Sequence, residues 1–167
     1  VQSQHRQARF YAKHGINMVR QHPVQSVLGL LQTTGRTRGF DPAKLERWDR
    51  WFSILKDNGI YMTWSLFYPH VITEADGYRS DLYNELPNRG GGKSTSGVVT
   101  MMPELQDAQW RWERELLNHV NPYTGLAYKD DPALAIVEVH NEDSIFWHAP
   151  LNDLVSYLSL ILISEPT

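Results

Sequence analysis

The chain of 167 residues contains no cysteine, which excludes disulfide bonds and thiolate metal sites but leaves the cellular compartment open. It also lacks a run of about 18 apolar residues, the length that a membrane-spanning helix needs. A net charge of −3 offers no basic excess for nucleic acid. No secretory leader is visible, but the sequence begins at Val1, so that absence carries no weight. We predict a globular domain that binds neither nucleic acid nor a membrane.

Several catalytic and ligand-binding sequence motifs are missing as well. There is no His-Glu-x-x-His pair and no Gly-x-Ser-x-Gly elbow, so neither a zinc protease nor a serine hydrolase is indicated. Gly92-Lys93-Ser94 resembles the end of a phosphate-binding loop, but Pro87 stands where the motif needs its first glycine. We therefore predict a mobile surface loop at 88–97. His140 and Glu142 could be two metal ligands, but no third has a characteristic spacing. No metal and no cofactor is predicted.

The chain does contain three segments of helical pattern, each followed by an apolar segment typical of a strand. Asp41 suits a helix N-cap and Pro42 the first helical position. The predicted helices cover residues 4–13, 42–57 and 103–120, and the predicted strands cover 16–20, 60–66 and 133–140. Strands that alternate with helices in this way are typical of a parallel sheet.

This alternation predicts an α/β fold, and the long segments after the strands favour a (β/α)8 TIM barrel. The segments 21–40, 67–102 and 141–150 are long, as in barrels whose strand-end loops carry the active site. A complete barrel needs about 250 residues, so we expect a partial one, about half. An open doubly wound sheet is the alternative.

The end of the chain differs from the rest. Residues 160–163 form an apolar run without a cap or a basic last turn. We interpret residues 1–159 as an incomplete barrel domain and 160–167 as a tail from a truncated reading frame that is foreign to the natural protein. A short natural protein is the alternative.

The most informative stretch is the apolar strand that ends in Asn141-Glu142. Regular alternation would place Glu138, His140 and Glu142 on one side of the strand. Acidic groups inside a barrel are usually tied to function or to a neighbouring arginine. A carboxylate at the carboxyl end of a parallel strand is where α/β barrels keep catalytic groups. The alternative is that Glu142 is a solvated loop residue without a functional role.

The Asn141-Glu142 pair, the segment 15–20 and the segment 55–62 together resemble clan A glycoside hydrolases, in particular the family 5 cellulases and mannanases. The resemblance implies a retaining O-glycosyl hydrolase that acts on β-linked oligo- or polysaccharides. It implies Glu142 as acid/base, Asn141 as the residue that holds a sugar hydroxyl, and Arg20 as the neighbour that keeps the nucleophile ionised. Secretion or a periplasmic location is favoured by the resemblance alone.

Further residues near the strand ends are candidates for binding the substrate. For the aromatic ones, packing in the core is the competing interpretation. The candidates are His22, Trp64, Tyr68, His70, His140 and Trp147.

The resemblance places the chain at barrel strands two to four, and the family nucleophile lies on the seventh. We therefore expect the nucleophile to lie outside these 167 residues and the isolated chain to be inactive. Three alternatives stay open: a non-catalytic carbohydrate-binding relative, a metal-dependent barrel hydrolase, and an unrelated doubly wound protein.

Overall fold

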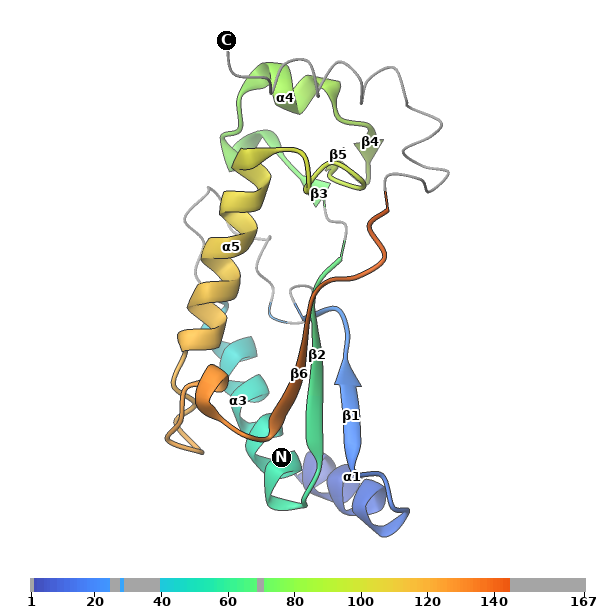
Figure 1. The fold of residues 1–167 in the computed structure, drawn as a ribbon, viewed down its shortest axis with the longest axis vertical. Coiled ribbons are helices and arrows are strands. Elements are labelled where there is room, and N and C mark those ends of the chain that lie inside the picture. The colour runs from blue at the N-terminus through green and yellow to red at the C-terminus, as the bar shows by residue number, and fades with distance from the viewer. Residues whose placement is uncertain (1, 25–27, 29–39, 69–70, 145–167) are drawn as a thin grey trace. The chain divides into compact units, whose positions relative to one another are not determined.

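A computed structural model describes residues 2–24, 28, 40–68 and 71–144 (Figure 1). The chain divides into two compact units, which we describe separately. Unit 1 comprises Val1–Leu30, Gly39–Phe67 and Glu113–Val139, and unit 2 comprises Leu31–Arg38, Tyr68–Trp112 and His140–Thr167. The predicted boundary between residues 159 and 160 lies outside the described residues.

Unit 1 is built on a parallel sheet of three strands. The strands are β1 (Met18–Gln21), β2 (Tyr61–Phe67) and β6 (Leu134–His140), in the order β1-β2-β6. β1 pairs parallel with β2, and Met18 stands opposite Tyr61. β6 runs in the same direction on the other side of β2 (Figure 1). The predicted α/β class with a parallel sheet is confirmed.

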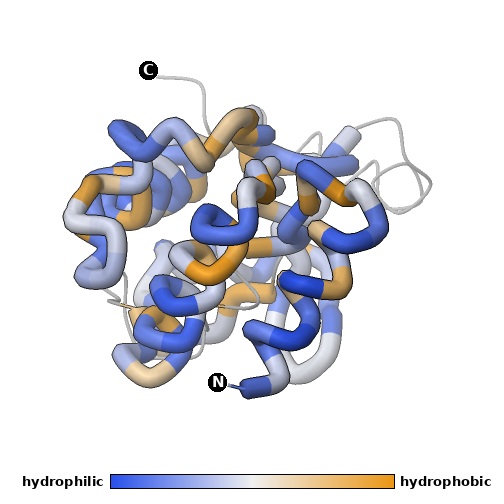
Figure 2. The backbone as a smooth tube through the Cα atoms, turned by 90° about the horizontal axis from the view of Figure 1, so that it is seen from below, coloured by the Kyte–Doolittle hydropathy of each residue, from blue (hydrophilic) through white to orange (hydrophobic). Residues whose placement is uncertain are grey.

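Each of the first two strands follows a helix, as predicted. α1 (Gln2–Lys13) precedes β1, and α3 (Pro42–Asp57) precedes β2. The Asp41 carboxylate caps α3 by accepting the backbone N–H of Ala43 at 2.9 Å. Gly59, at φ +70°, ends the helix in the left-handed conformation that glycine adopts without strain. The helices carry both hydrophilic and hydrophobic stretches, as amphipathic helices do (Figure 2).

The core of unit 1 lies between α3 and β2. Trp64 of β2 is completely buried, and its ring centroid lies 5.4 Å from that of Trp48 and 5.7 Å from that of Phe52, both on α3. Tyr128, in the 3-10 helix η2 (Tyr128–Asp130), packs edge-on against the Trp64 ring at 4.6 Å. Aromatic pairs in this geometry add to the free energy gained by burial.

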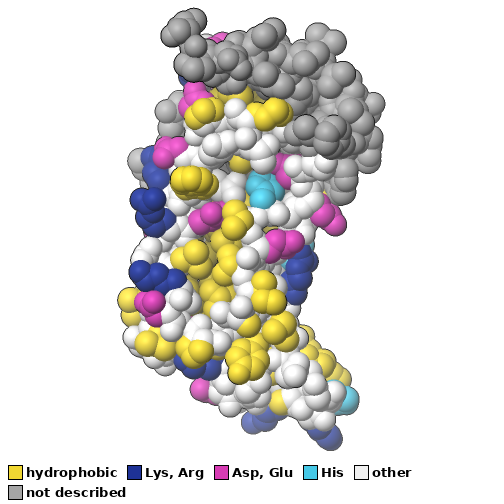
Figure 3. All heavy atoms as spheres, viewed as in Figure 1, with side chains coloured by type: hydrophobic (Ala, Val, Ile, Leu, Met, Phe, Trp, Pro, Cys, Tyr) yellow, Lys and Arg dark blue, Asp and Glu magenta, His cyan; other side chains and the backbone are white. Residues whose placement is uncertain are grey.

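β6 is less covered than its apolar sequence predicts. Ile136 is 52% exposed, Val137 38% and Val139 51%. Successive residues of a strand point to opposite faces, so both faces of β6 are open. Hydrophobic side chains accordingly gather on the face of the molecule shown in Figure 3. Strands of parallel sheets are normally covered on both faces, so this exposure is unusual.

Unit 2 contains a small antiparallel sheet that the sequence did not predict. Its order is β3-β5-β4, with two short helical segments beside it: β3 (Val71–Ile72), β4 (Asn88–Arg89), β5 (Gly92–Ser94), η1 (Glu74–Asp76) and α4 (Ser80–Glu85). This sheet packs over its own hydrophobic core, made of Ile72, Leu82, Leu86, Val98, Val99, Met102 and Leu105.

The prediction of a surface loop at 88–97 is therefore corrected in part: residues 88–91 are exposed, but the segment forms β4 and β5 and is buried from Ser94 onward. Gly92 lies in β5, where a Cβ atom would stand 2.3 Å from the carbonyl oxygen of Ile72 and 2.6 Å from Val71 Cγ1. The glycine serves close packing of two strands rather than flexibility. Thr95, next to β5, is completely buried.

The helix α5 (Pro103–Asn118) begins in unit 2 and ends in unit 1. Leu105 and Trp112 are buried at 1% and 3% exposure, and Leu116 is fully buried. Val120, which lies within the predicted helix 103–120, is 55% exposed, and the helix already ends at Asn118. Within the described part of the chain, no helix is both long and apolar enough to cross a membrane.

Candidate functional site

The Asn141-Glu142 pair follows directly on the carboxyl end of β6, as predicted. Asn141 is buried, with 7% of its surface exposed, whereas Glu142 is exposed. Glu142 has φ +48°, a left-handed conformation that is uncommon outside glycine. The predicted strand alternation therefore does not continue to Glu142, because the backbone leaves the extended conformation after His140.

His140 was predicted to bind substrate, but the structure engages its ring within unit 2. His140 Nδ1 lies 3.1 Å from Gln109 Oε1, and its Nε2 lies 3.1 Å from Asp143 Oδ2. Only 15% of the His140 side chain is exposed. These contacts hold the His140 ring in place, and a sugar contact for His140 stays a prediction.

Asp143 lies at the other end of this segment, after Glu142. Its carboxylate accepts the backbone N–H of Gly97 at 2.6 Å, and its side chain is 3% exposed. The two residues that flank the Asn141-Glu142 pair are thus both held by contacts within unit 2.

A second polar group of residues lies at the strand ends of unit 1. Arg20 of β1 donates to Glu138 of β6 at 2.6 Å. His22 Nδ1 lies 2.9 Å from the hydroxyl oxygen of Ser65 in β2. Hydrogen bonds from Ser65 and then from Arg20, together with the Arg20 charge, lower the pKa of the Glu138 carboxyl group. We call Arg20, His22, Ser65 and Glu138 the strand-end network.

Arg20 was predicted to keep a nucleophile ionised. Within the part of the chain that the structure describes, its ion-pair partner is Glu138, and the same physical effect acts on that carboxyl group. Arg20 and Glu138 have side chains 46% and 39% exposed, so both can be reached from solvent. His22, also exposed, remains a substrate-binding candidate.

The aromatic candidates separate by burial. Trp64, at 0% exposure, lies in the core of unit 1, where no sugar can stack on its ring; its substrate-binding assignment is corrected to core packing. Tyr68 is half-buried and stays a prediction. His70 and Trp147 lie outside the described residues.

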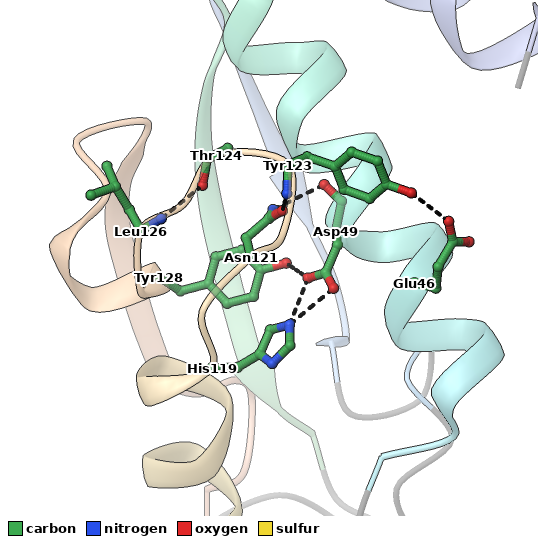
Figure 4. Close-up of polar contacts among 8 residues, drawn as sticks. All are labelled: Glu46, Asp49, His119, Asn121, Tyr123, Thr124, Leu126 and Tyr128. Atoms are coloured by element: carbon green, nitrogen blue, oxygen red, sulfur yellow. Dashed lines mark hydrogen bonds and ion pairs between the residues drawn. The ribbon is translucent and has the colours of Figure 1, made fainter.

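A third polar group, in unit 1, is buried and was not predicted (Figure 4). The Asp49 carboxylate on α3 accepts a hydrogen bond from the Tyr128 hydroxyl and lies 2.9 Å from His119 Nε2. The Asn121 amide donates to the Asp49 carbonyl oxygen at 2.9 Å. Burial, reinforced by the bond to Asp49, raises the pKa of Tyr128. This group, the Asp49 cluster, ties α3 to the segment that precedes β6.

No set of three or more His, Asp or Glu side chains in the described ranges is placed to hold a metal ion.

Comparison with known proteins shows that the fold of this chain is similar to part of a solved structure. No protein-family model matches the chain, and no curated protein matches it. Among solved structures, the endo-1,4-beta-mannanase from Rhizomucor miehei is similar, with a TM-score of 0.56 and 22% sequence identity. The match covers 85% of this chain and 40% of the mannanase, so the chain spans less than half of that protein's length. At this identity the likeness shows the fold alone: the chain is an α/β protein whose fold is similar to part of a mannanase.

Proposed function

We propose that this chain carries the acid/base residue of a retaining glycoside hydrolase, and that this residue is Glu142. The observation that supports the proposal best is its position. Asn141-Glu142 directly follows the carboxyl end of a parallel strand, in a fold similar to that of a mannanase.

We further propose that β1, β2 and β6 form strands two to four of a (β/α)8 barrel. Their parallel order agrees with that arrangement. The open faces of β6, with Ile136 52% and Val139 51% exposed, would be covered by further elements of the barrel. The 40% coverage of the mannanase accords with about half a barrel.

In the proposed mechanism, a second carboxylate about 5 Å from Glu142 attacks the anomeric carbon. The glycosidic C–O bond breaks, and the proton of Glu142 passes to the leaving oxygen. Water then hydrolyses the glycosyl-enzyme after Glu142 takes one of its protons. The nucleophile would lie outside these 167 residues, with Arg20 holding it ionised. Asn141 would hold a sugar hydroxyl beside the bond that breaks.

The substrate class that we propose is a β-linked polysaccharide, with β-1,4-mannan as the first to test because of the mannanase likeness. His22, Tyr68 and His140 are the described residues that we propose for sugar contact. His70 and Trp147 remain proposals from the sequence.

The test uses the full-length protein with Glu142→Gln. Hydrolysis of mannan should fall by about 10²–10⁴-fold, the usual contribution of a general acid–base. A dinitrophenyl β-mannoside, whose leaving group needs no proton, should still form the glycosyl-enzyme. Azide, which attacks without general-base help, should then speed turnover and yield a β-glycosyl azide.

The matched control is Glu115→Gln, which changes an exposed glutamate on α5 and should leave both reactions unchanged. Mannan hydrolysis by Glu142→Gln at the level of this control would refute the proposed role. Turnover of a nitrophenyl glycoside by the 167-residue chain alone would contradict the proposal that the nucleophile lies elsewhere.

A further inference from the structure

The Asn141-Glu142 pair is anchored on both sides within unit 2. We propose that Asp143 is a positioning residue, which holds the backbone of this pair and thereby sets the direction of the Glu142 carboxyl group. The inference rests on the function proposed above for Glu142.

Asp143 contacts the turn at residues 96–97 through its carboxylate. Its carboxylate accepts the Gly97 N–H at 2.6 Å and lies 3.4 Å from the Ser96 hydroxyl. With 3% of the side chain exposed, little water competes for these contacts. Hydrogen bonds to a charged carboxylate are roughly twice as strong as neutral ones. Asp143 is therefore fastened to the 96–97 turn rather than resting on a surface.

The partner segment is itself part of a packed region. Gly97 adopts φ +77°, and Val98 and Val99, which follow it, are 0% and 2% exposed in the core of unit 2. An anchor on this turn cannot drift without disturbing that core. The Asp143 contact thus joins the Asn141-Glu142 pair to a rigid part of the fold.

His140 supplies the anchor on the other side. Its Nδ1 lies 3.1 Å from Gln109 Oε1 on α5, and this contact fixes the ring; its Nε2 lies 3.1 Å from Asp143 Oδ2, which is an ion pair only when the imidazole carries a proton. Asp143 therefore contacts both the 96–97 turn and the histidine that starts the segment. Both ends of the segment 140–143 are therefore held by hydrogen bonds within unit 2.

The backbone of Glu142 shows why such anchors are needed. A glutamate at φ +48° is strained, and a strained residue persists only where its surroundings leave no alternative. The Glu142 side chain is exposed, so its own packing does not impose this conformation. We infer that the flanking contacts do, among them the hydrogen bond of Asp143 to Gly97.

The test compares variants of the full-length protein on a mannan oligosaccharide. Asp143→Ala should lower kcat by about a hundredfold, the loss expected when a catalytic group moves by about 1 Å, with little change in KM. Asp143→Asn keeps an acceptor oxygen for Gly97 and should restore most of kcat. Asp107→Ala, which changes an exposed carboxylate on α5, is the control and should behave as the parent.

The deciding measurement is the double variant. If Asp143 acts through Glu142, adding Asp143→Ala to Glu142→Gln should cost no further activity. An equal loss in both backgrounds, or a kcat of Asp143→Ala matching the control, would overturn the inference. If Asp143→Ala does not fold, Asp143→Ser takes its place, because its hydroxyl cannot span Gly97 and His140. Full activity of Glu142→Gln alone would instead contradict the proposed function, so the two failures are distinguishable.

Discussion

Unit 1 contains two polar groups, the Asp49 cluster and the strand-end network, which have similar residues but differ in burial. The Asp49 cluster is buried: Asp49 is 3% exposed, and Tyr128 is completely buried. The strand-end network is open, with the Arg20 and Glu138 side chains 46% and 39% exposed. Each group contains a carboxylate, a basic side chain and a hydroxyl group, but only the carboxylate of the Asp49 cluster is shielded from water.

The two groups differ in whether water can take the place of a lost hydrogen-bond partner. Inside the protein, removing one partner leaves the others without water, so the Asp49 cluster should matter for stability. At the strand ends, solvent can replace each partner, so the ion pair contributes little to folding. The carboxyl ends of parallel strands are also where α/β barrels place their functional groups. The comparison separates a structural anchor from a group available to a substrate.

The largest effect should come from Asp49→Ala. The substitution leaves the Tyr128 hydroxyl buried without its acceptor and His119 without its carboxylate partner. We expect the free energy of unfolding to fall by about 3–5 kcal/mol, because two hydrogen bonds to a carboxylate are lost and each is typically worth about 1.5–3 kcal/mol. Urea denaturation followed by tryptophan fluorescence measures it. A loss below about 1 kcal/mol would place the cluster with ordinary surface pairs.

A smaller effect should follow from Tyr128→Phe, which removes one hydrogen bond but keeps the ring packed on Trp64. We expect a loss of about 1.5–3 kcal/mol, typical of a hydrogen bond to a charged group. Tyr123→Phe is the matched control, because that hydroxyl donates to Glu46 at 2.6 Å but the residue is 48% exposed. Equal losses in the two variants would show that burial does not distinguish them.

The smallest effect should come from Glu138→Gln in the strand-end network. We expect less than about 1 kcal/mol near neutral pH, because the pair is exposed. The pKa of Glu138 is lowered in the folded state, so its contribution is present above the unfolded pKa and is lost as pH falls through the folded pKa. Glu138→Gln should therefore match the parent in acid and differ slightly at neutral pH. A difference that grows towards acid would contradict this sign.

The elements of unit 1 could be predicted because their signals are local. Asp41-Pro42 begins α3 and Asn58-Gly59 ends it, and both lie next to the residues that they act on. The parallel direction of the sheet followed from the alternation of helices and strands. The pairing of Glu138 with Arg20 is one of the two outcomes that the sequence left open for an acidic group on this strand.

The small sheet of unit 2 was missed for the opposite reason. Its strands have two or three residues each, too short for any periodicity to be read. Gly90, Gly91 and Gly92 suggested mobility, although Gly92 is required by the close approach of Ile72. The Asp143 anchor was missed too, because its partner Gly97 lies 46 residues away in the chain.

By itself, the amino-acid sequence determined the helices α1, α3 and α5, the strands β1, β2 and β6, and the position of Asn141-Glu142 after β6, because capping residues and hydrophobic spacing act over a few residues. Only the tertiary structure decided that Trp64 is core, that Asp49 is buried among polar partners, and that Asp143 reaches Gly97. Burial and long-range pairing depend on which distant segments meet, and spacing along one chain does not contain that information.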